Sequence, residues 1–123
     1  MRTVLIDTDI LVDLLRGNAR ARTLLEENED RQVIASITVA ELYAGSRNKK
    51  EAGAIAALIG LFDVIALDDA IAESAGLIRR RYGASHGTGL ADAIIAATAL
   101  AADAQLATRN RKHYPMFKTI LGY

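Results

Sequence analysis

The stretch Val4-Leu5-Ile6-Asp7 decides the fold. Three consecutive aliphatic residues followed by an acid are typical of a short strand buried on both faces, as the strands of parallel sheets are. Asp7 then lies at the carboxyl end of that strand. In an open α/β sheet, ligands bind in the crevice outside the carboxyl ends of the strands. Asp7 is therefore a candidate for chemistry as well as for structure.

The rest of the chain alternates between strand-like and helix-like stretches. Further apolar runs predict strands at residues 33–35, 62–67, 105–108 and 119–121. The spacing of apolar side chains predicts helices over residues 10–17, 21–25, 38–45, 52–61, 68–83 and 90–102. Strands that alternate with helices predict an α/β fold, in which a central parallel sheet of about five strands is covered by helices on both faces.

Two local patterns predict where helices begin and end. Thr38 and Glu41 have the spacing of a capping box, which predicts a helix that begins near Thr38. Residues 83–89 are rich in glycine and predict a loop, so the preceding helix should end at Gly83. The three arginines 79–81 would then lie in the last turn of that helix, where they complement its dipole.

Length and composition exclude several classes of protein. A chain of 123 residues has the size of one domain, and we treat residues 1–123 as a single unit. Because there is no cysteine, disulfide frameworks, thiolate zinc sites and cysteine nucleophiles are excluded. No apolar run is long enough to cross a bilayer, so we expect a soluble, cytoplasmic protein with no membrane partner. The 15 basic residues balance the 15 acidic ones, so only local patches would hold a polyanion.

Four polar residues are predicted to converge at one edge of the sheet. Asp7 ends the first strand, Glu41 falls in the first turn of the helix after the second strand, and Asn110 follows the fourth strand. Asp92 opens the helix that leads into the fourth strand. Since such a helix runs antiparallel to the strands it covers, it begins at their carboxyl edge. Three carboxylates and an amide are therefore expected in one crevice.

This combination of side chains predicts a metal site. Clustered carboxylates repel one another unless a cation neutralises them, and an all-oxygen set without histidine or cysteine suits Mg²⁺ or Mn²⁺. Such a cation orients a phosphodiester, lowers the pKa of a bound water and stabilises the leaving oxygen. The predicted reaction is hydrolysis of a phosphate ester.

Each of these residues also has a purely structural interpretation. Glu41 could serve only the capping box, and Asp92 could serve only the N-terminus of its helix. Asp7 or Asp9 could be the N-cap of the helix near Ile10, and we assign Asp9 to that helix start and not to the metal. Taken together these interpretations weaken, because independent caps need not share one edge of a sheet.

Four blocks of the sequence resemble the PIN-domain family. The blocks are residues 4–11, which bring an aliphatic strand to Asp7, residues 34–42, residues 90–99 and residues 106–110. They occur in the family's order and span the whole chain. Within the family, the sequence is most similar to the VapC-type toxin nucleases of bacterial and archaeal toxin–antitoxin pairs.

The resemblance implies a role for each polar residue. Asp7, Glu41 and Asp92 would be metal ligands and catalytic residues. Asn110 would join them in the catalytic set, with Thr108 as a supporting hydroxyl. The wider family often has aspartate at the position of Asn110, so this side chain is expected to position water or to support the ligands from outside.

The resemblance also implies an activity and partners. The expected activity is that of a Mg²⁺- or Mn²⁺-dependent endoribonuclease, the toxin of a type II pair. The expected partners are an RNA substrate, a second copy of the chain in a homodimer, and a small cognate antitoxin that occupies the groove of the active site. Arg109, Arg111 and Lys112 flank Asn110 and are expected to hold RNA phosphates.

Three other interpretations remain open at this point. Asp7-Thr8-Asp9 also resembles the nucleophile motif of haloacid-dehalogenase-like phosphatases, with Asp7 as nucleophile and Asp9 as acid and base. A phosphoacceptor receiver domain has similar size and acids at a strand edge, but it needs a lysine at the end of its last strand, whereas Lys118 precedes residues 119–121. A non-catalytic PIN-like module that only binds RNA or protein is the third alternative.

Overall fold

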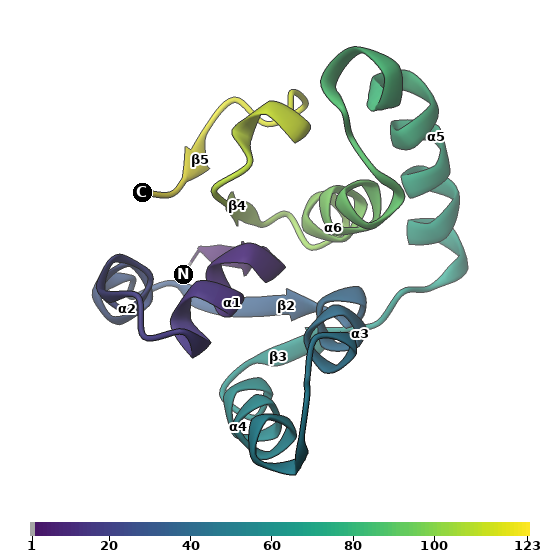
Figure 1. Cartoon of the computed structure of the whole chain (residues 1–123). Helices are drawn as coiled ribbons and strands as arrows, with labels where there is room; N and C mark the ends of the chain where they lie inside the picture. Colours follow the sequence, from purple (N-terminus) through teal and green to yellow (C-terminus); the bar gives the residue numbers. More distant parts are fainter. Residues whose placement is uncertain (1) are drawn as a thin grey trace.

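The computed structural model describes residues 2–123 and contains one sheet of five parallel strands (Figure 1). The strands are β1 (Thr3–Ile6), β2 (Arg31–Ala35), β3 (Asp63–Ile65), β4 (Gln105–Ala107) and β5 (Ile120–Leu121). The helices are α1 (Thr8–Leu15), α2 (Ala19–Glu27), α3 (Ser36–Ala44), α4 (Lys49–Ile59), α5 (Asp69–His86) and α6 (Leu90–Ala101), with a short 3₁₀ helix η1 (Arg111–His113). The predicted α/β fold with a five-stranded parallel sheet is confirmed. Within residues 2–123, no helix combines the length and the apolar character that crossing a membrane requires.

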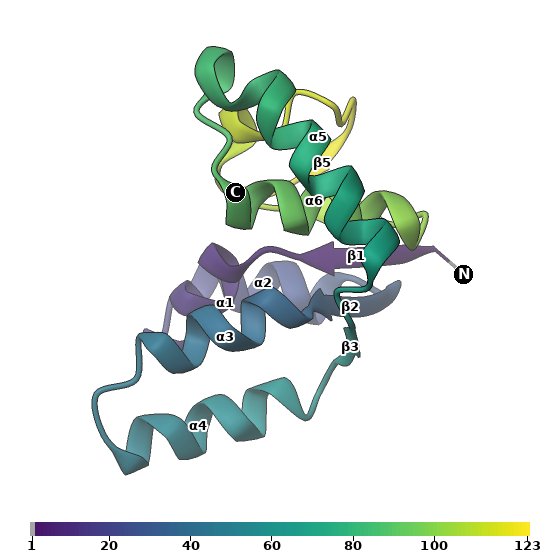
Figure 2. The ribbon, with the colours of Figure 1, turned by 90° about the vertical axis from the view of Figure 1, so that its right-hand side faces the viewer.

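β1 is the central strand and is buried on both faces, as predicted. Val4 and Ile6 pack into a cluster built mainly by α1, α2, α3 and α4. Leu5 points the other way, into a second cluster that includes residues of α6. Figure 2 shows α5 and α6 above β1 and α3 and α4 below it. Successive side chains of β1 therefore point into two separate cores, one on each face of the sheet, and helices cover both faces.

The strand order places a crevice next to β1. In the order β3-β2-β1-β4-β5, the chain first moves outward from β1 to β3 and then returns to add β4 and β5 on the other side. The order reverses between β1 and β4, and ligands bind at such a switch point in open α/β sheets. The backbone N–H of Asp7 donates to the carbonyl oxygen of Ala107 at 2.9 Å, which brings the ends of the two strands together.

The start of α3 differs from the sequence prediction. The helix begins at Ser36, directly after β2, and its N-cap Ala35 makes no side-chain hydrogen bond. Thr38 is fully buried inside the helix, so the predicted capping box of Thr38 and Glu41 is wrong. Glu41 consequently lies beyond the first turn of α3, where its side chain is free for contacts with α1.

The end of α5 also differs from the prediction. The helix continues past Gly83 to His86 and ends at Gly87, which has φ +67°. Glycine tolerates this left-handed conformation, so Gly87 is the true C-cap. A Cβ atom at Gly83 would meet only the flexible guanidinium of the exposed Arg79, so lack of space does not require glycine at this position. The arginines 79–81 therefore lie in the middle of α5 and not in its last turn.

Candidate active site

A cavity of about 360 Å³ opens at the switch point of the sheet. The residues that line it come from α1, α3, α6 and the segment after β4, and they are Asp7, Thr8, Asp9, Val12, Asp13, Arg16, Glu41, Asp92, Arg109 and Asn110. The structure therefore brings together four of the predicted site residues, Asp7, Glu41, Asp92 and Asn110. Among the predicted RNA-binding residues, Arg109 reaches this cavity.

Asp7 is the buried centre of the site. It is the N-cap of α1, and its Oδ1 atom accepts a hydrogen bond from the backbone N–H of Thr8 at 2.7 Å. Its Oδ2 atom accepts from the hydroxyl of Thr108 at 2.6 Å, so the structure places the predicted supporting hydroxyl against Asp7. Burial, and then the charge of Asp9, raise the pKa of Asp7 from 3.8 to about 7. A cation beside Asp7 would favour its ionised form.

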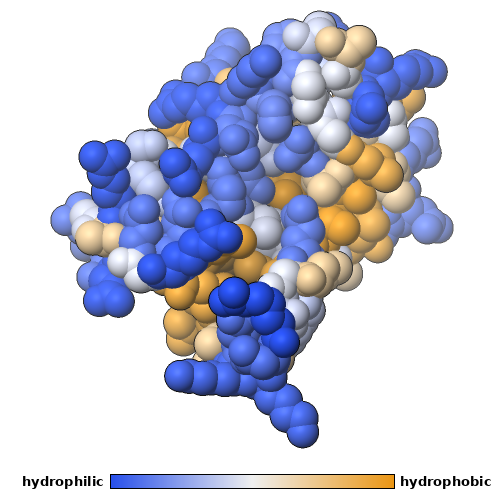
Figure 3. All heavy atoms as spheres, viewed as in Figure 1, coloured by the Kyte–Doolittle hydropathy of each residue, from blue (hydrophilic) through white to orange (hydrophobic). Residues whose placement is uncertain are grey.

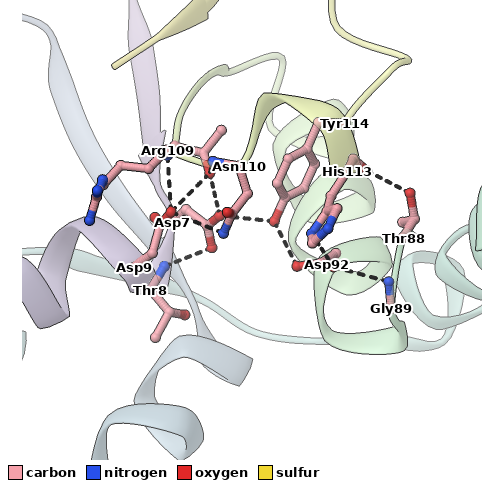
Figure 4. Close-up of polar contacts among 11 residues, drawn as sticks. Asp7, Thr8, Asp9, Thr88, Gly89, Asp92, Arg109, Asn110, His113 and Tyr114 are labelled. Atoms are coloured by element: carbon pink, nitrogen blue, oxygen red, sulfur yellow. Dashed lines mark hydrogen bonds and ion pairs between the residues drawn. The ribbon is translucent and has the colours of Figure 1, made fainter. Parts of the chain in front are cut away.

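Tyr114 links Asp7 to Asp92 (Figure 4). Its hydroxyl oxygen lies 3.0 Å from Asp7 Oδ2 and 3.3 Å from Asp92 Oδ1. Burial, and then the charges of the two aspartates, raise the pKa of Tyr114 far above the ordinary value, so the phenol remains a donor. The sequence analysis did not identify Tyr114. The available signal was that a buried tyrosine hydroxyl needs a polar partner.

Asp92 serves both the helix start and the cavity. Its Oδ2 atom accepts a hydrogen bond from the backbone N–H of Gly89 at 3.0 Å, at the N-terminus of α6. The Nδ1 atom of His113 lies 3.1 Å from the same oxygen but lacks hydrogen-bond geometry. Asp92 Oδ1 faces Tyr114. The structural interpretation of Asp92 and its place in the site are therefore compatible.

Glu41 lies at the rim of the cavity. Its Oε1 atom accepts a hydrogen bond from the hydroxyl of Thr8 at 2.7 Å, and the hydroxyl oxygens of Thr8 and Thr38 are 2.9 Å apart. Across residues 2–123, no three acidic or histidine side chains lie close enough to hold one metal ion in this conformation. Asp7 and Asp92 are coupled through Tyr114, while Glu41 is attached to the start of α1.

Asp9 lies in the first turn of α1, as predicted, and it also makes contacts that the sequence analysis did not identify. Its Oδ2 atom accepts hydrogen bonds from the backbone N–H of Arg109 at 3.0 Å and from Asn110 Nδ2 at 3.2 Å. Burial is the main cause that raises its pKa. The contacts join residues about one hundred positions apart, and the only sequence signal was the close spacing of Asp7 and Asp9.

The donor chemistry of the cavity fits a hard divalent cation. The available ligands are carboxylate and amide oxygens, which Mg²⁺ and Mn²⁺ prefer. Asp9 Oδ1 is buried and has no hydrogen-bond partner within residues 2–123. The raised pKa of Asp7 indicates that its charge lacks compensation, which a cation would supply.

The three predicted RNA-binding residues have different surroundings. Arg109 forms an ion pair of 2.7 Å with Asp13, and its guanidinium carbon lies 5.5 Å from the centre of the Tyr123 ring. Arg111 donates to the carbonyl oxygen of Ile120 at 2.8 Å, which ties η1 to β5. Lys112 is exposed on η1.

Comparison with known proteins identifies the family. The model of the PIN domain matches residues 4–116. The chain is 42% identical over 120 residues to Ribonuclease VapC19 of Mycobacterium tuberculosis, covering 92% of this chain and 93% of that protein. It is 40% identical to Ribonuclease VapC10 of the same species, covering 95% and 90%. A toxin–antitoxin complex from Klebsiella pneumoniae contains a chain with a TM-score of 0.83 and 30% identity, covering 96% of this chain and 95% of that one. Matches along nearly the whole length, together with the acid-lined crevice beside β1, show that this chain belongs to the PIN-domain family and, within it, to the VapC type.

Proposed function

We propose that this protein is a cytoplasmic endoribonuclease, the toxin of a type II toxin–antitoxin pair, and that it hydrolyses RNA phosphodiester bonds with Mg²⁺ or Mn²⁺. The observation that carries the proposal is the pair Asp7 and Asp92, which α1 and α6 bring to one cavity and which share the hydroxyl of Tyr114. The names of the relatives, Ribonuclease VapC19 and Ribonuclease VapC10, support the same activity.

The residues of the cavity would have different roles in the reaction. Asp7 and Asp92 would hold the cation, with Glu41 approaching from the rim and Asn110 from the segment after β4. A bound Mg²⁺ or Mn²⁺ supplies an acidified water and neutralises charge on the phosphate. Asp7 is held in place by Thr8 and Thr108, so its carboxylate keeps one orientation while substrate binds.

RNA phosphates would be held at the basic side of the cavity. Arg109 lines the cavity, and its ion pair with Asp13 fixes the guanidinium while about half of the side chain stays exposed. Lys112 extends the positive charge along η1. Arg111 donates from one of its nitrogens to the carbonyl oxygen of Ile120, so fewer of its N–H groups remain for a phosphate.

A second cavity supports the proposed antitoxin partner. It measures about 700 Å³, lies between α1, α3 and α4, and shares Val12, Arg16 and Glu41 with the first cavity. In Figure 3, hydrophobic residues gather in the hollow between α1 and α4, surrounded by polar ones. A bound segment could thus place apolar side chains in this groove and an arginine among the acids, where a guanidinium would pair with two carboxylates.

The antitoxin is tested by co-purification from a strain that carries the neighbouring genes. We expect a small protein with an arginine, or a lysine, flanked by apolar residues. Replacing that basic residue with alanine should weaken inhibition. Free expression without a partner, absence of growth inhibition and absence of RNA cleavage would together contradict the toxin assignment.

The homodimer is a further part of the proposal. Leu77 on α5 and Leu90 and Leu100 on α6 are large apolar side chains that remain exposed. A second copy would cover such side chains and so favour association. Light scattering coupled to size-exclusion chromatography should give twice the mass of 13.2 kDa. A monomer at micromolar concentration would contradict this part.

The phosphatase alternative leaves the main features of the cavity without a role. It would use Asp7 and Asp9 but assigns nothing to Glu41 or Asp92, which line the same cavity. The PIN-domain match over residues 4–116 agrees with the ribonuclease.

The decisive assay is RNA cleavage by the purified protein in Mg²⁺, Mn²⁺ or EDTA. We expect cleavage with either cation, none in EDTA, and none from Asp92→Asn with either cation. Cleavage in EDTA, or an Asp92→Asn variant that cleaves at the parental rate, would contradict the proposed metal-dependent mechanism. A fully folded parent without cleavage would favour the non-catalytic module.

A further inference from the structure

We propose that Asp9 is a positioning residue, which orients the side-chain amide of Asn110 so that its carbonyl oxygen is offered to the cavity. The consequence for catalysis rests on the proposed ribonuclease function, whereas the pairing of the two side chains does not. Asp9 would act through Asn110 and would not itself contact the RNA.

The direction of the amide follows from the chemistry of its partner. Asn110 Nδ2 lies 3.2 Å from Asp9 Oδ2 (Figure 4). Asp9 Oδ2 already accepts a hydrogen bond from the backbone N–H of Arg109, so this oxygen is an acceptor and the NH₂ end of the amide must face it. Asn110 also lines the cavity, and no hydrogen bond within residues 2–123 engages its Oδ1 atom. The oxygen is therefore the end of the amide that remains for a ligand.

The backbone of Asn110 is held on both sides, which fixes the point from which its side chain extends toward Asp9. The N–H of Asn110 donates to the hydroxyl of Thr108 at 3.0 Å, and its carbonyl oxygen accepts from the N–H of His113 at 2.9 Å. Asp9 Oδ2 also accepts from the N–H of Arg109 at 3.0 Å. One carboxylate thus fixes both the path of the chain and the orientation of the amide.

The same contact explains why an amide suits this position better than an acid. An aspartate at position 110 would set two carboxylates against each other across the gap now bridged at 3.2 Å. An asparagine at position 9 would keep its own oxygen toward the N–H of Arg109, where Asp9 Oδ2 lies now, so it would still accept from the amide of Asn110. Alanine at position 9 would remove this acceptor.

Catalysis provides the first test, with four variants that separate positioning from simple loss of charge. In Asp9→Ala the amide loses the acceptor that holds it, so kcat should fall by about tenfold or more, as for other supporting residues of metal sites, with KM nearly unchanged. Asn110→Ala should lose about as much, because both changes remove the same oriented oxygen. Asp9→Asn, which keeps an oxygen in the same place, should restore most of the kcat that Asp9→Ala loses, and Asp9→Ala/Asn110→Ala should lose no more than either single variant.

Two kinetic results would overturn the inference. One is an Asp9→Asn variant that is no more active than Asp9→Ala, because the acceptor at position 9 would then not be what orients the amide. The other is Asn110→Ala at the parental rate, which would mean that Asp9 acts without Asn110.

Thermal unfolding in EDTA tests the pairing without any activity. Asn110→Asp should melt below the parent, and adding Asp9→Asn should raise the melting temperature again. If Asp9→Asn/Asn110→Asp melts no higher than Asn110→Asp, the proposed closeness of the two side chains is overturned. If the parent cleaves no RNA while this rescue is observed, the proposed function fails and the pairing stands. As a metal-only probe, Mn²⁺ should raise the melting temperature of Asp9→Asn more than that of Asp9→Ala, and an equal rise would contradict the role in the metal site.

Discussion

Replacing Asp7 by asparagine should stabilise the metal-free protein at high pH. Ionising Asp7 destabilises the folded protein, because its carboxylate is only 4% exposed and lies near Asp9. Asparagine fills nearly the same space without the charge, and it keeps an oxygen for either Thr8 or the Thr108 and Tyr114 hydroxyls. The expected gain is therefore the cost of ionising Asp7 in the folded state, reduced by the hydrogen bonds that asparagine cannot accept.

The magnitude follows from the pKa of Asp7. Folding raises this pKa from 3.8 to about 7. Between these values the folded protein keeps a proton that the unfolded chain has released, so stability falls as the pH rises, and the loss is complete above pH 7. At about 1.36 kcal/mol for each pKa unit, the full loss is about 4 kcal/mol. A lost acceptor costs about 1 to 2 kcal/mol, which leaves a net gain of about 2 to 3 kcal/mol for Asp7→Asn at pH 8.

Urea unfolding in EDTA from pH 5 to pH 8 measures this difference. The advantage of Asp7→Asn should shrink as the pH falls below 7 and be close to zero near pH 5. Asp103→Asn, at an exposed turn, is the matched control for loss of a carboxylate. A difference between Asp7→Asn and the parent that is constant over this pH range, or a variant that is less stable at pH 8, would refute the reasoning about Asp7.

Other substitutions test the site and the fold. Glu41→Gln should abolish RNA cleavage, and a fully active variant would remove Glu41 from the site. Tyr114→Phe should weaken Mn²⁺ binding by about tenfold, measured by calorimetry, because the shared donor that aligns the two aspartates is lost. Thr98→Val is the control for this variant, because it removes a buried hydroxyl on α6 that does not contact the two aspartates. It should bind Mn²⁺ like the parent. Gly122→Ala should lower stability by about 1 to 3 kcal/mol, since its Cβ would lie 2.6 Å from a backbone carbonyl oxygen at the end of β4. Gly53→Ala, in open space on α4, should instead raise stability by about 0.5 to 1 kcal/mol in the same urea experiment.

The sequence predicted the sheet well because burial on both faces leaves a strong pattern. Val4, Leu5 and Ile6 are an uninterrupted aliphatic run, and the structure buries all three completely or nearly so. The edge of the sheet at which Asp7, Asp92 and Asn110 meet follows from the direction of parallel strands and of the helices between them. These features depend on periodicity and on chain direction, which a single sequence contains.

Element boundaries failed where tertiary packing outweighs a local signal. Thr38 has the residue type of a helix cap, but burial against Thr8 places it inside α3. Gly83 has the residue type of a helix end, but α5 continues to His86. Both residues are common at termini for local reasons, and contacts with other elements decide where the helices start and stop.

The contacts of Asp9 and Tyr114 could not be predicted because they join distant parts of the chain. Asp9 meets Asn110 across one hundred and one positions, and Tyr114 meets Asp7 across one hundred and seven. Periodicity locates elements and their faces, but it does not specify which side chains meet across a crevice. The supporting residues of the site therefore become visible only in the folded structure.

Anomalous diffraction from crystals soaked in Mn²⁺ tests the central claim most directly. The account predicts one strong peak in the cavity beside β1, within about 2.0 to 2.2 Å of a carboxylate oxygen of Asp7 and of one of Asp92, and no peak there in crystals of Asp92→Asn. A peak elsewhere on the molecule, or none in the cavity at millimolar Mn²⁺, would contradict the assignment of this cavity as the metal centre of a ribonuclease.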